Sequence, residues 1–160
     1  MKILLVSDLH IPVRLSSFPE ELIEQLPNFD CVIGLGDYVD LDTVLVLKKF
    51  SKQFYGVHGN MDYPDVKEYL PATLTINLMG YTIGLCHGWG PPFGLREKIL
   101  NLFSPKPQII FYGHTHETDH SKLSGTTFVN PGSLGESGNY AVVELCKDFV
   151  KVEFKRLQKS

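Results

Sequence analysis

Short apolar runs alternate with helix-like segments through the first half of the chain. Residues 2–7, 31–35 and 53–57 have the β-branched, apolar character of strands, and the segments between them carry apolar residues at helical spacing. Ser17 with Glu20 is typical of a capping box, and Asp42 is predicted to cap the second helix. Because strands joined by crossover helices form parallel sheets, we expect an α/β beginning.

The second half of the chain favours antiparallel pairing. Apolar and polar residues alternate on both sides of Met79-Gly80, which predicts a β-hairpin there. A helical stripe runs from Leu95 to Phe103 and ends before Pro105. No repeat or linker interrupts the pattern, so residues 1–160 are predicted to form a single domain. Further strands are predicted over 109–112 and 128–129, and in a closing hairpin over 141–145 and 150–154.

Composition and charge narrow the functional classes. The 160 residues are 43% hydrophobic, enough for one sizeable core, and the formal net charge of -3 gives no general attraction to nucleic acid or anionic membranes. Cys31, Cys86 and Cys146 lie far apart, which argues against a disulfide framework or a zinc knuckle and favours core positions. The first apolar run is too short for a signal peptide, and no stretch approaches membrane-spanning length. We therefore expect a cytoplasmic protein.

Residues of the types that bind divalent metals come immediately after five of the apolar runs. Ligand sites of open α/β sheets lie outside the carboxyl ends of the strands, so these side chains can converge. Asp8 and His10 are two positions apart, as are His114 and His116. In an extended segment this spacing places both side chains of a pair on the same side. Imidazole, carboxylate and amide ligands without thiolate favour manganese, iron, nickel or zinc over calcium. The candidate ligands are Asp8, His10, Asp37, Asn60, His87, His114 and His116.

Each candidate ligand also has an ordinary structural explanation. A single Asp after a strand is often a helix cap or turn former, His87 could be a satisfied core histidine, and Asn60 could be a turn residue. Together these explanations require unrelated reasons for polar residues to follow five apolar runs, where burying them unpaired is costly. A single site that binds two metal ions explains the polar residues after all five runs. Asp37 is the natural candidate for the carboxylate that both ions share.

The motifs resemble those of the calcineurin-like metallophosphoesterase family, most closely its small, single-domain YfcE-type phosphodiesterases. The resemblance extends from Asp8 to Gly135. It rests on Asp8-Leu9-His10, Gly36-Asp37, Gly59-Asn60-Met61-Asp62, His87-Gly88, Gly113-His114-Thr115-His116 and Asn130-Pro131-Gly132-Ser133. It implies an αββα sandwich of two mixed β-sheets flanked by helices. It also implies one metal held by Asp8, His10, Asp37 and His116, and a second held by Asp37, Asn60, His87 and His114.

The resemblance further implies a hydrolase that cleaves phosphodiesters. Two divalent ions, most often manganese in such enzymes, would lower the pKa of a bridging water so that hydroxide attacks phosphorus. Many family members place a histidine after the Gly-Asn pair to protonate the leaving group, whereas this chain has Met61, as YfcE-type members also lack that histidine. A thioether cannot donate a proton. The predicted catalytic residues are Asp37, Asn60, His87 and His10, and the predicted substrate contacts are Asn60 and Trp89.

Several neighbouring residues have two interpretations. His58 could reach the leaving oxygen, but an ordinary strand role is favoured. Asp62 could orient its loop or act as a cap. Tyr38 and Trp89 could line a substrate pocket or simply pack, and packing is the more cautious interpretation.

Two other functional classes stay open. A retromer subunit resembles this fold and is a non-catalytic interaction module, but its catalytic ligand set is incomplete, whereas here every ligand position is filled. Related two-metal sites cut nucleic acid, although the net charge and the lack of a clustered basic run argue against a nuclease. The expected partner is a small phosphodiester and not a membrane, and a homo-oligomer is compatible with the sequence.

Overall fold

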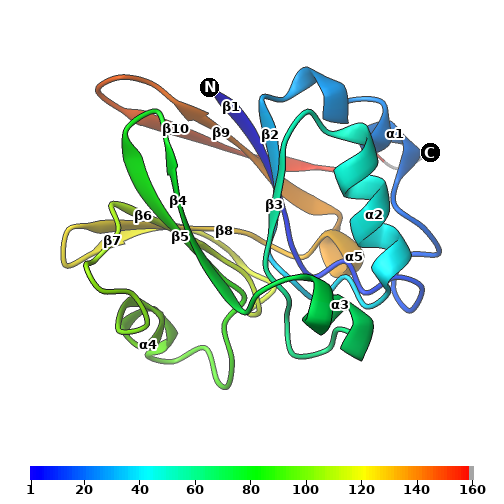
Figure 1. Ribbon diagram of the computed structural model, residues 1–160, viewed down its shortest axis with the longest axis horizontal. Coiled ribbons are helices and arrows are strands. Elements are labelled where there is room, and N and C mark those ends of the chain that lie inside the picture. The colour runs from blue at the N-terminus through cyan, green and yellow to red at the C-terminus, as the bar shows by residue number, and fades with distance from the viewer. Residues whose placement is uncertain (159–160) are drawn as a thin grey trace.

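Two five-stranded β-sheets pack against each other, and helices cover their outer faces (Figure 1). The structure is a computed structural model and describes residues 1–158. The first sheet has the order β10 (Val150–Arg156), β9 (Asn139–Leu145), β1 (Lys2–Val6), β2 (Cys31–Gly34) and β3 (Phe54–Gly56). The second has the order β4 (Thr73–Leu78), β5 (Tyr81–Cys86), β6 (Ile109–Tyr112), β8 (Thr126–Pro131) and β7 (Thr118–Leu123). Both contain parallel and antiparallel pairs, which confirms the predicted αββα sandwich of two mixed sheets.

Alternation along β1 shows why the sandwich forms. Ile3 and Leu5 point into the core between the sheets, whereas Leu4 and Val6 point to the outer face that the helices cover. All four side chains are fully buried, because both faces of the strand are covered. This is why the sequence of β1 is a continuous apolar run and does not alternate between apolar and polar residues. The strand is therefore held from both faces, and the loop that follows it starts from a rigid support.

Helices close both outer faces. On the first sheet lie α1 (Glu20–Ile23), α2 (Leu41–Phe50), α3 (Pro64–Tyr69) and α5 (Leu134–Ser137), with a 3₁₀ helix at Leu26–Asn28. On the second sheet lies α4 (Leu95–Leu100). Its Ile99 packs in one cluster with Ile110 of β6 and Phe128 of β8. No helix within residues 1–158 is long and apolar enough to cross a membrane.

Several local predictions are confirmed. Met79 and Gly80 join β4 to β5 with φ of 51° and 82°, the left-handed pair that a tight hairpin turn requires. The closing hairpin is present as β9 and β10. All three cysteines are free thiols, and Cys31 and Cys86 occupy the predicted core positions, whereas Cys146 is half-buried, so a core position was wrong for it.

Both predicted helix caps are wrong. Helix α2 begins at Leu41, and its cap is Asp40, whose Oδ1 accepts hydrogen bonds from the backbone N–H and the hydroxyl of Thr43. Asp42 already lies inside the first turn, where its charge suits the helix dipole. Helix α1 is a single turn after Pro19 without any side-chain cap, so Ser17 plays no capping part.

One strand and two α-helices were not predicted, each for a physical reason. Strand β7 is an edge strand with a polar sequence and no fully buried residue, so it lacks an apolar alternation. Helices α3 and α5 have six and four residues, too few to display a helical period. Helix α5 matters most, because it lies beside the metal-ligand loops described next.

Candidate metal centre

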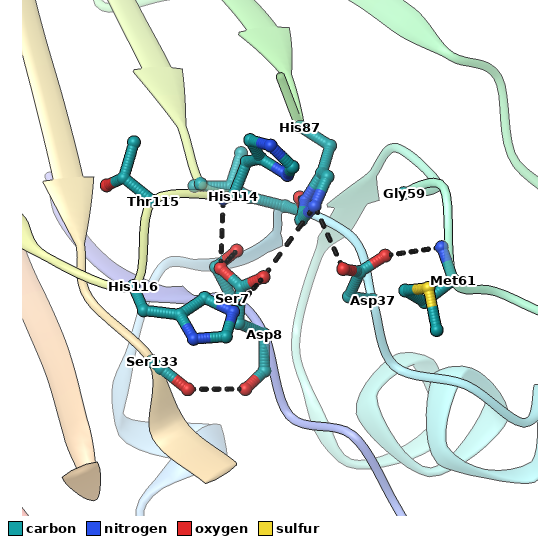
Figure 2. A network of polar contacts seen from close by, with 12 residues as sticks. Ser7, Asp8, Asp37, Gly59, Met61, His87, His114, Thr115, His116 and Ser133 are labelled. Carbon is teal, nitrogen blue, oxygen red and sulfur yellow. Dashed lines mark hydrogen bonds and ion pairs between the residues drawn. The ribbon is translucent and has the colours of Figure 1, made fainter. Parts of the chain in front are cut away.

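The candidate ligands lie in loops at the carboxyl ends of β1, β2, β3, β5 and β6. Strands β1, β2 and β3 run parallel, as do β5 and β6, so these ends carry the loops to one region of the molecule. Figure 2 shows Asp8, Asp37, His87 and His116 pointing toward one another. Two potential metal-binding clusters result, one of Asp8, His10 and His116 and the other of Asp8, Asp37 and His87.

Asp8 lies at the centre of the site. Its Oδ1 is 3.3 Å from His116 Nε2, 3.6 Å from His87 Nε2 and 3.8 Å from His10 Nε2. Its Oδ2 accepts hydrogen bonds from the Ser7 hydroxyl at 2.8 Å and from the His114 backbone N–H at 3.0 Å. Burial alone would raise the pKa of Asp8, but these neighbours hold it well below its usual range. Asp8 is therefore a fully buried carboxylate with one oxygen fixed and the other facing three imidazoles.

Asp37 faces histidines of both clusters. Its Oδ2 is 3.1 Å from His87 Nε2 and 3.8 Å from His10 Nε2. Its Oδ1 accepts a hydrogen bond from the Met61 backbone N–H at 2.9 Å. Burial opposes ionisation, but the His87 imidazole beside it lowers the pKa of Asp37 below its ordinary value. The position suits the predicted shared ligand, although Asp8 is the residue common to both clusters.

Two histidines are oriented through their second ring nitrogen. His87 Nδ1 lies 2.7 Å from the Leu35 carbonyl, and His116 Nδ1 contacts the Glu136 carboxylate. Since those oxygens can only accept, Nδ1 carries a proton in each ring, so Nε2, which faces the carboxylates, is the atom available to a metal. Metal-binding histidines have this arrangement. Glu136 was missed because the sequence gives no sign that this residue of α5, 20 positions after His116, reaches the His116 ring.

Three polar atoms test whether the site fits a cation. Among residues 1–158, the buried side-chain atoms without a hydrogen-bond partner are Asp8 Oδ1, His10 Nε2 and His87 Nε2. Buried polar atoms are normally satisfied, because leaving one unpaired costs about 1–3 kcal/mol. All three are metal-ligand atoms and they face each other, so divalent cations would satisfy them. The residues therefore fit the metal ions that the sequence predicts.

Two predicted ligands lie outside these clusters. His114 Nε2 donates to the Gly90 carbonyl at 2.7 Å, which leaves Nδ1 as its ligand atom, and its ring packs edge-on against His87 with centroids 5.4 Å apart. Asn60 is exposed in the loop after β3. Their assignment to a second metal stays a prediction. Trp89 is 40% exposed, and Lys98 Nζ lies 5.5 Å from the centre of its ring.

The ligand loops are not extended, contrary to the prediction. Asp8, His10, Asp37, His114 and His116 have φ of 56°, 51°, 56°, 74° and 65°, in the left-handed region. Such conformations are uncommon outside glycine and cost about 1–3 kcal/mol each. A spacing of two positions therefore does not place the paired side chains on one side of a strand. Sharp turns aim each side chain individually, and strong packing of the strands sustains the turns.

Two glycines allow the loops to approach each other. A Cβ at Gly59 would lie 2.1 Å from Asp37 Oδ1, and a Cβ at Gly113 would lie 2.0 Å from the Ser7 hydroxyl oxygen. Either atom would displace the carboxylate or the group that orients Asp8. Both positions therefore require glycine.

Asp62 and Asn130 hold the loops together. Asp62 accepts backbone hydrogen bonds from Asp37 at 3.0 Å, Val39 at 2.7 Å and Gly59 at 2.7 Å, so it orients its loop as predicted and does not cap a helix. The Asn130 amide donates to the Gly113 carbonyl at 3.0 Å and the Thr115 hydroxyl at 3.1 Å.

Tyr38 is fully buried and donates a hydrogen bond to the Val57 carbonyl, so its role is packing.

Metal affinity is expected to rise steeply with pH. The Asp8 carboxylate raises the pKa of His116 to about 9. Burial would lower the pKa of His87, but Asp37 raises it above its ordinary value. A metal must displace these protons, so affinity for Mn²⁺ should increase from pH 6 to pH 9, by up to about tenfold per pH unit for each proton released.

Titration calorimetry in buffers of different ionisation enthalpy checks this by counting released protons. His116→Gln should reduce the count, whereas His120→Gln on β7 should leave it unchanged. An affinity that does not vary between pH 6.5 and pH 8.5 would contradict the expectation.

Known proteins share both the sequence pattern and the fold. Residues 1–148 match the family model of the calcineurin-like phosphoesterase superfamily domain. A probable metallophosphoesterase of Methanocaldococcus jannaschii is 30% identical over 135 residues, which cover 83% of this chain and 68% of that protein. A Thermotoga maritima protein solved by solution NMR is 55% identical with a TM-score of 0.82, covering 98% of this chain and 99% of that one.

Zinc-bound Vps29 of Entamoeba histolytica has the same fold, with a TM-score of 0.76, 22% identity and 98% coverage of both chains. That similarity concerns the fold alone. The family match covers nearly the whole chain and includes every candidate ligand. The chain therefore belongs to the calcineurin-like phosphoesterase superfamily.

Proposed function

We propose that this chain is a two-metal phosphodiesterase. One observation carries the proposal: buried ligand atoms of Asp8, His10 and His87 face each other without hydrogen-bond partners, beside Asp37 and His116. Asp8, His10 and His116 would hold one ion, and Asp37, Asn60, His87 and His114 the other, with Asp37 shared. When bound, two divalent ions supply a hydroxide nucleophile at neutral pH and neutralise charge on the phosphoryl group.

The residues of the chain prepare the site for this chemistry. The Leu35 carbonyl and Glu136 keep the protons of His87 and His116 on Nδ1 and so present their Nε2 atoms to the ions. Ser7 and the His114 backbone fix one oxygen of Asp8. These contacts preorganise Asp8, His87 and His116 for metal binding.

The absence of a proton donor at position 61 bears on the substrate. Met61 is 58% exposed, and its contribution is the backbone N–H that it donates to Asp37. Its thioether cannot protonate a leaving oxygen, so esters with good leaving groups should react fastest. The preference for diesters is supported by the resemblance to small phosphodiesterases. Manganese is the proposed metal, and imidazole with carboxylate also suits nickel, iron or zinc.

The proposal is tested by removing and restoring the metal. Protein stripped with a chelator should be inactive, and Mn²⁺ should restore hydrolysis of bis-p-nitrophenyl phosphate with two ions bound per chain. The monoester p-nitrophenyl phosphate should react more slowly. Full activity in stripped, metal-free protein, or no hydrolysis of either ester by protein that holds two ions, would refute it.

The alternative of a non-catalytic interaction module gains support from the fold shared with Vps29. It predicts that protein loaded with metal is inert toward every phosphoester. The unpaired ligand atoms are what a metal-dependent enzyme requires, but Vps29 with the same fold is also solved with zinc, so turnover and not metal content decides between the two classes. A nuclease would show cleavage of oligonucleotides with affinity falling as salt rises, and the net charge of -3 argues against it.

A further inference from the structure

A cavity of about 390 Å³ opens directly beside the metal centre. Part of its wall is made by the ligand loops themselves, through Gly59, Asn60, His87 and Gly88; Gly59 and His87 appear in Figure 2 beside Asp37. The volume falls within the range of about 300–1,000 Å³ that is usual for small-molecule sites. Any group attached to a phosphoryl unit on the metal centre would therefore have this cavity within reach.

The remaining wall is mainly apolar. This part of the wall is made by Cys86 and Trp89, which flank His87-Gly88, and by Ala72 and Leu102 from two other segments of the chain. Trp89 and Leu102 are 40% and 47% exposed, so large apolar surfaces face the solvent here. Lys98 Nζ lies over the Trp89 ring, 5.5 Å from its centroid, in a cation–π contact. A ligand that covered these side chains would gain the free energy of removing apolar surface from water.

We propose that this cavity binds an aromatic or similarly apolar ester group of the substrate while its phosphoryl group lies on the metal centre. The inference rests on the proposed function and adds the class of substrate. The cavity has few polar groups beyond the ligand loops, namely His58 and Thr73. An apolar ring suits such walls better than a nucleobase, whose polar edges would lose hydrogen bonds to water.

The test compares two phosphonates that share a head group and resist hydrolysis. Calorimetry on Mn²⁺-loaded protein gives the dissociation constants of methylphosphonate and phenylphosphonate. Phenylphosphonate should bind about tenfold more tightly, because its ring is removed from water in the cavity. A ratio near one in the unaltered protein would overturn the proposal.

Two variants locate the effect. Ala72 is exposed, so Ala72→Phe fills the cavity without disturbing the core, and the ratio of the two constants should fall toward one. Asn77→Phe adds the same ring at an exposed position of β4 outside the cavity and should retain the tenfold ratio. Leu102→Ala, which removes a wall, should also lower the ratio. An unchanged ratio in both Ala72→Phe and Leu102→Ala would place the ring elsewhere and overturn the proposal.

The binding test is independent of turnover. Protein that prefers phenylphosphonate but hydrolyses no phosphoester would support the cavity and contradict the proposed phosphodiesterase. Protein that hydrolyses diesters but binds both phosphonates equally would support the phosphodiesterase and contradict the cavity.

Discussion

Replacing Asp37 with Asn is expected to reduce metal-dependent phosphodiester hydrolysis by about a thousandfold or more, equivalent to about 4 kcal/mol of transition-state stabilisation. Asp37 Oδ2 lies within 3.8 Å of His10 and 3.1 Å of His87, so one carboxylate serves both sides of the centre. An amide carries no charge and cannot hold two cations close together. The number of Mn²⁺ ions bound per chain should therefore fall together with kcat.

Asp148→Asn provides the matched control, because Asp148 is exposed in the turn between β9 and β10. It removes the same charge from the chain and should leave both turnover and metal content unchanged. Thermal unfolding of each variant shows that the fold is intact. If Asp37→Asn kept full turnover and two ions, Asp37 could not be the shared ligand, and Asp8, common to both clusters, would take that place.

Strand ends could be predicted from the sequence because burial on two faces leaves an unmistakable apolar run. β1, β2 and β6 are buried along nearly their whole length, whereas β5 alternates at its start and is buried over its last four residues. The polar residues that follow each strand mark the edge of the sheet. Asp8, Asp37 and His87 were found in this way, and the structure brings them together. The apolar pattern alone therefore indicates where the centre lies.

The conformation of the loops could not be predicted in the same way. His10 and His116 lie in left-handed turns, which no local pattern of apolar residues signals, and only the packed strands on either side sustain them. Glu136 reaches His116 from α5, a one-turn helix that the Ser133 side chain caps. The Ser133 hydroxyl also donates a hydrogen bond to the Asp8 carbonyl. Such second contacts depend on the meeting of loops from distant strands. They carry no signature within their own segment.

The same reasoning identifies Asp62 as the residue that joins the loops after β2 and β3. Its two oxygens accept three backbone hydrogen bonds, from Asp37, Val39 and Gly59, and its side chain is buried. Burial raises the pKa of Asp62, and the three donors oppose that shift. The carboxylate thus connects the segment that carries Asp37 to the segment that carries Asn60.

Asp62→Ala is therefore expected to lower the free energy of unfolding by about 3 kcal/mol or more. Three buried N–H groups lose their acceptor, at a cost of about 1–3 kcal/mol each, and water that enters the space left by the side chain offsets part of that cost. Urea denaturation of metal-free protein measures the change. Asp62→Asn should cost less, since one amide oxygen can still accept from Asp37 and Gly59, while its NH₂ group opposes the Val39 donor.

A purely structural role would change stability alone, so metal binding separates the two roles of Asp62. If the residue positions Asp37, Asp62→Ala should weaken Mn²⁺ binding at temperatures where the variant is fully folded, and Asp62→Asn should restore much of the affinity. Asp148→Ala, at an exposed position, should change neither quantity. A variant Asp62→Ala with native stability and native metal affinity would show that the packed strands alone hold the ligand loops, because nothing else in this region accepts those three N–H groups among residues 1–158.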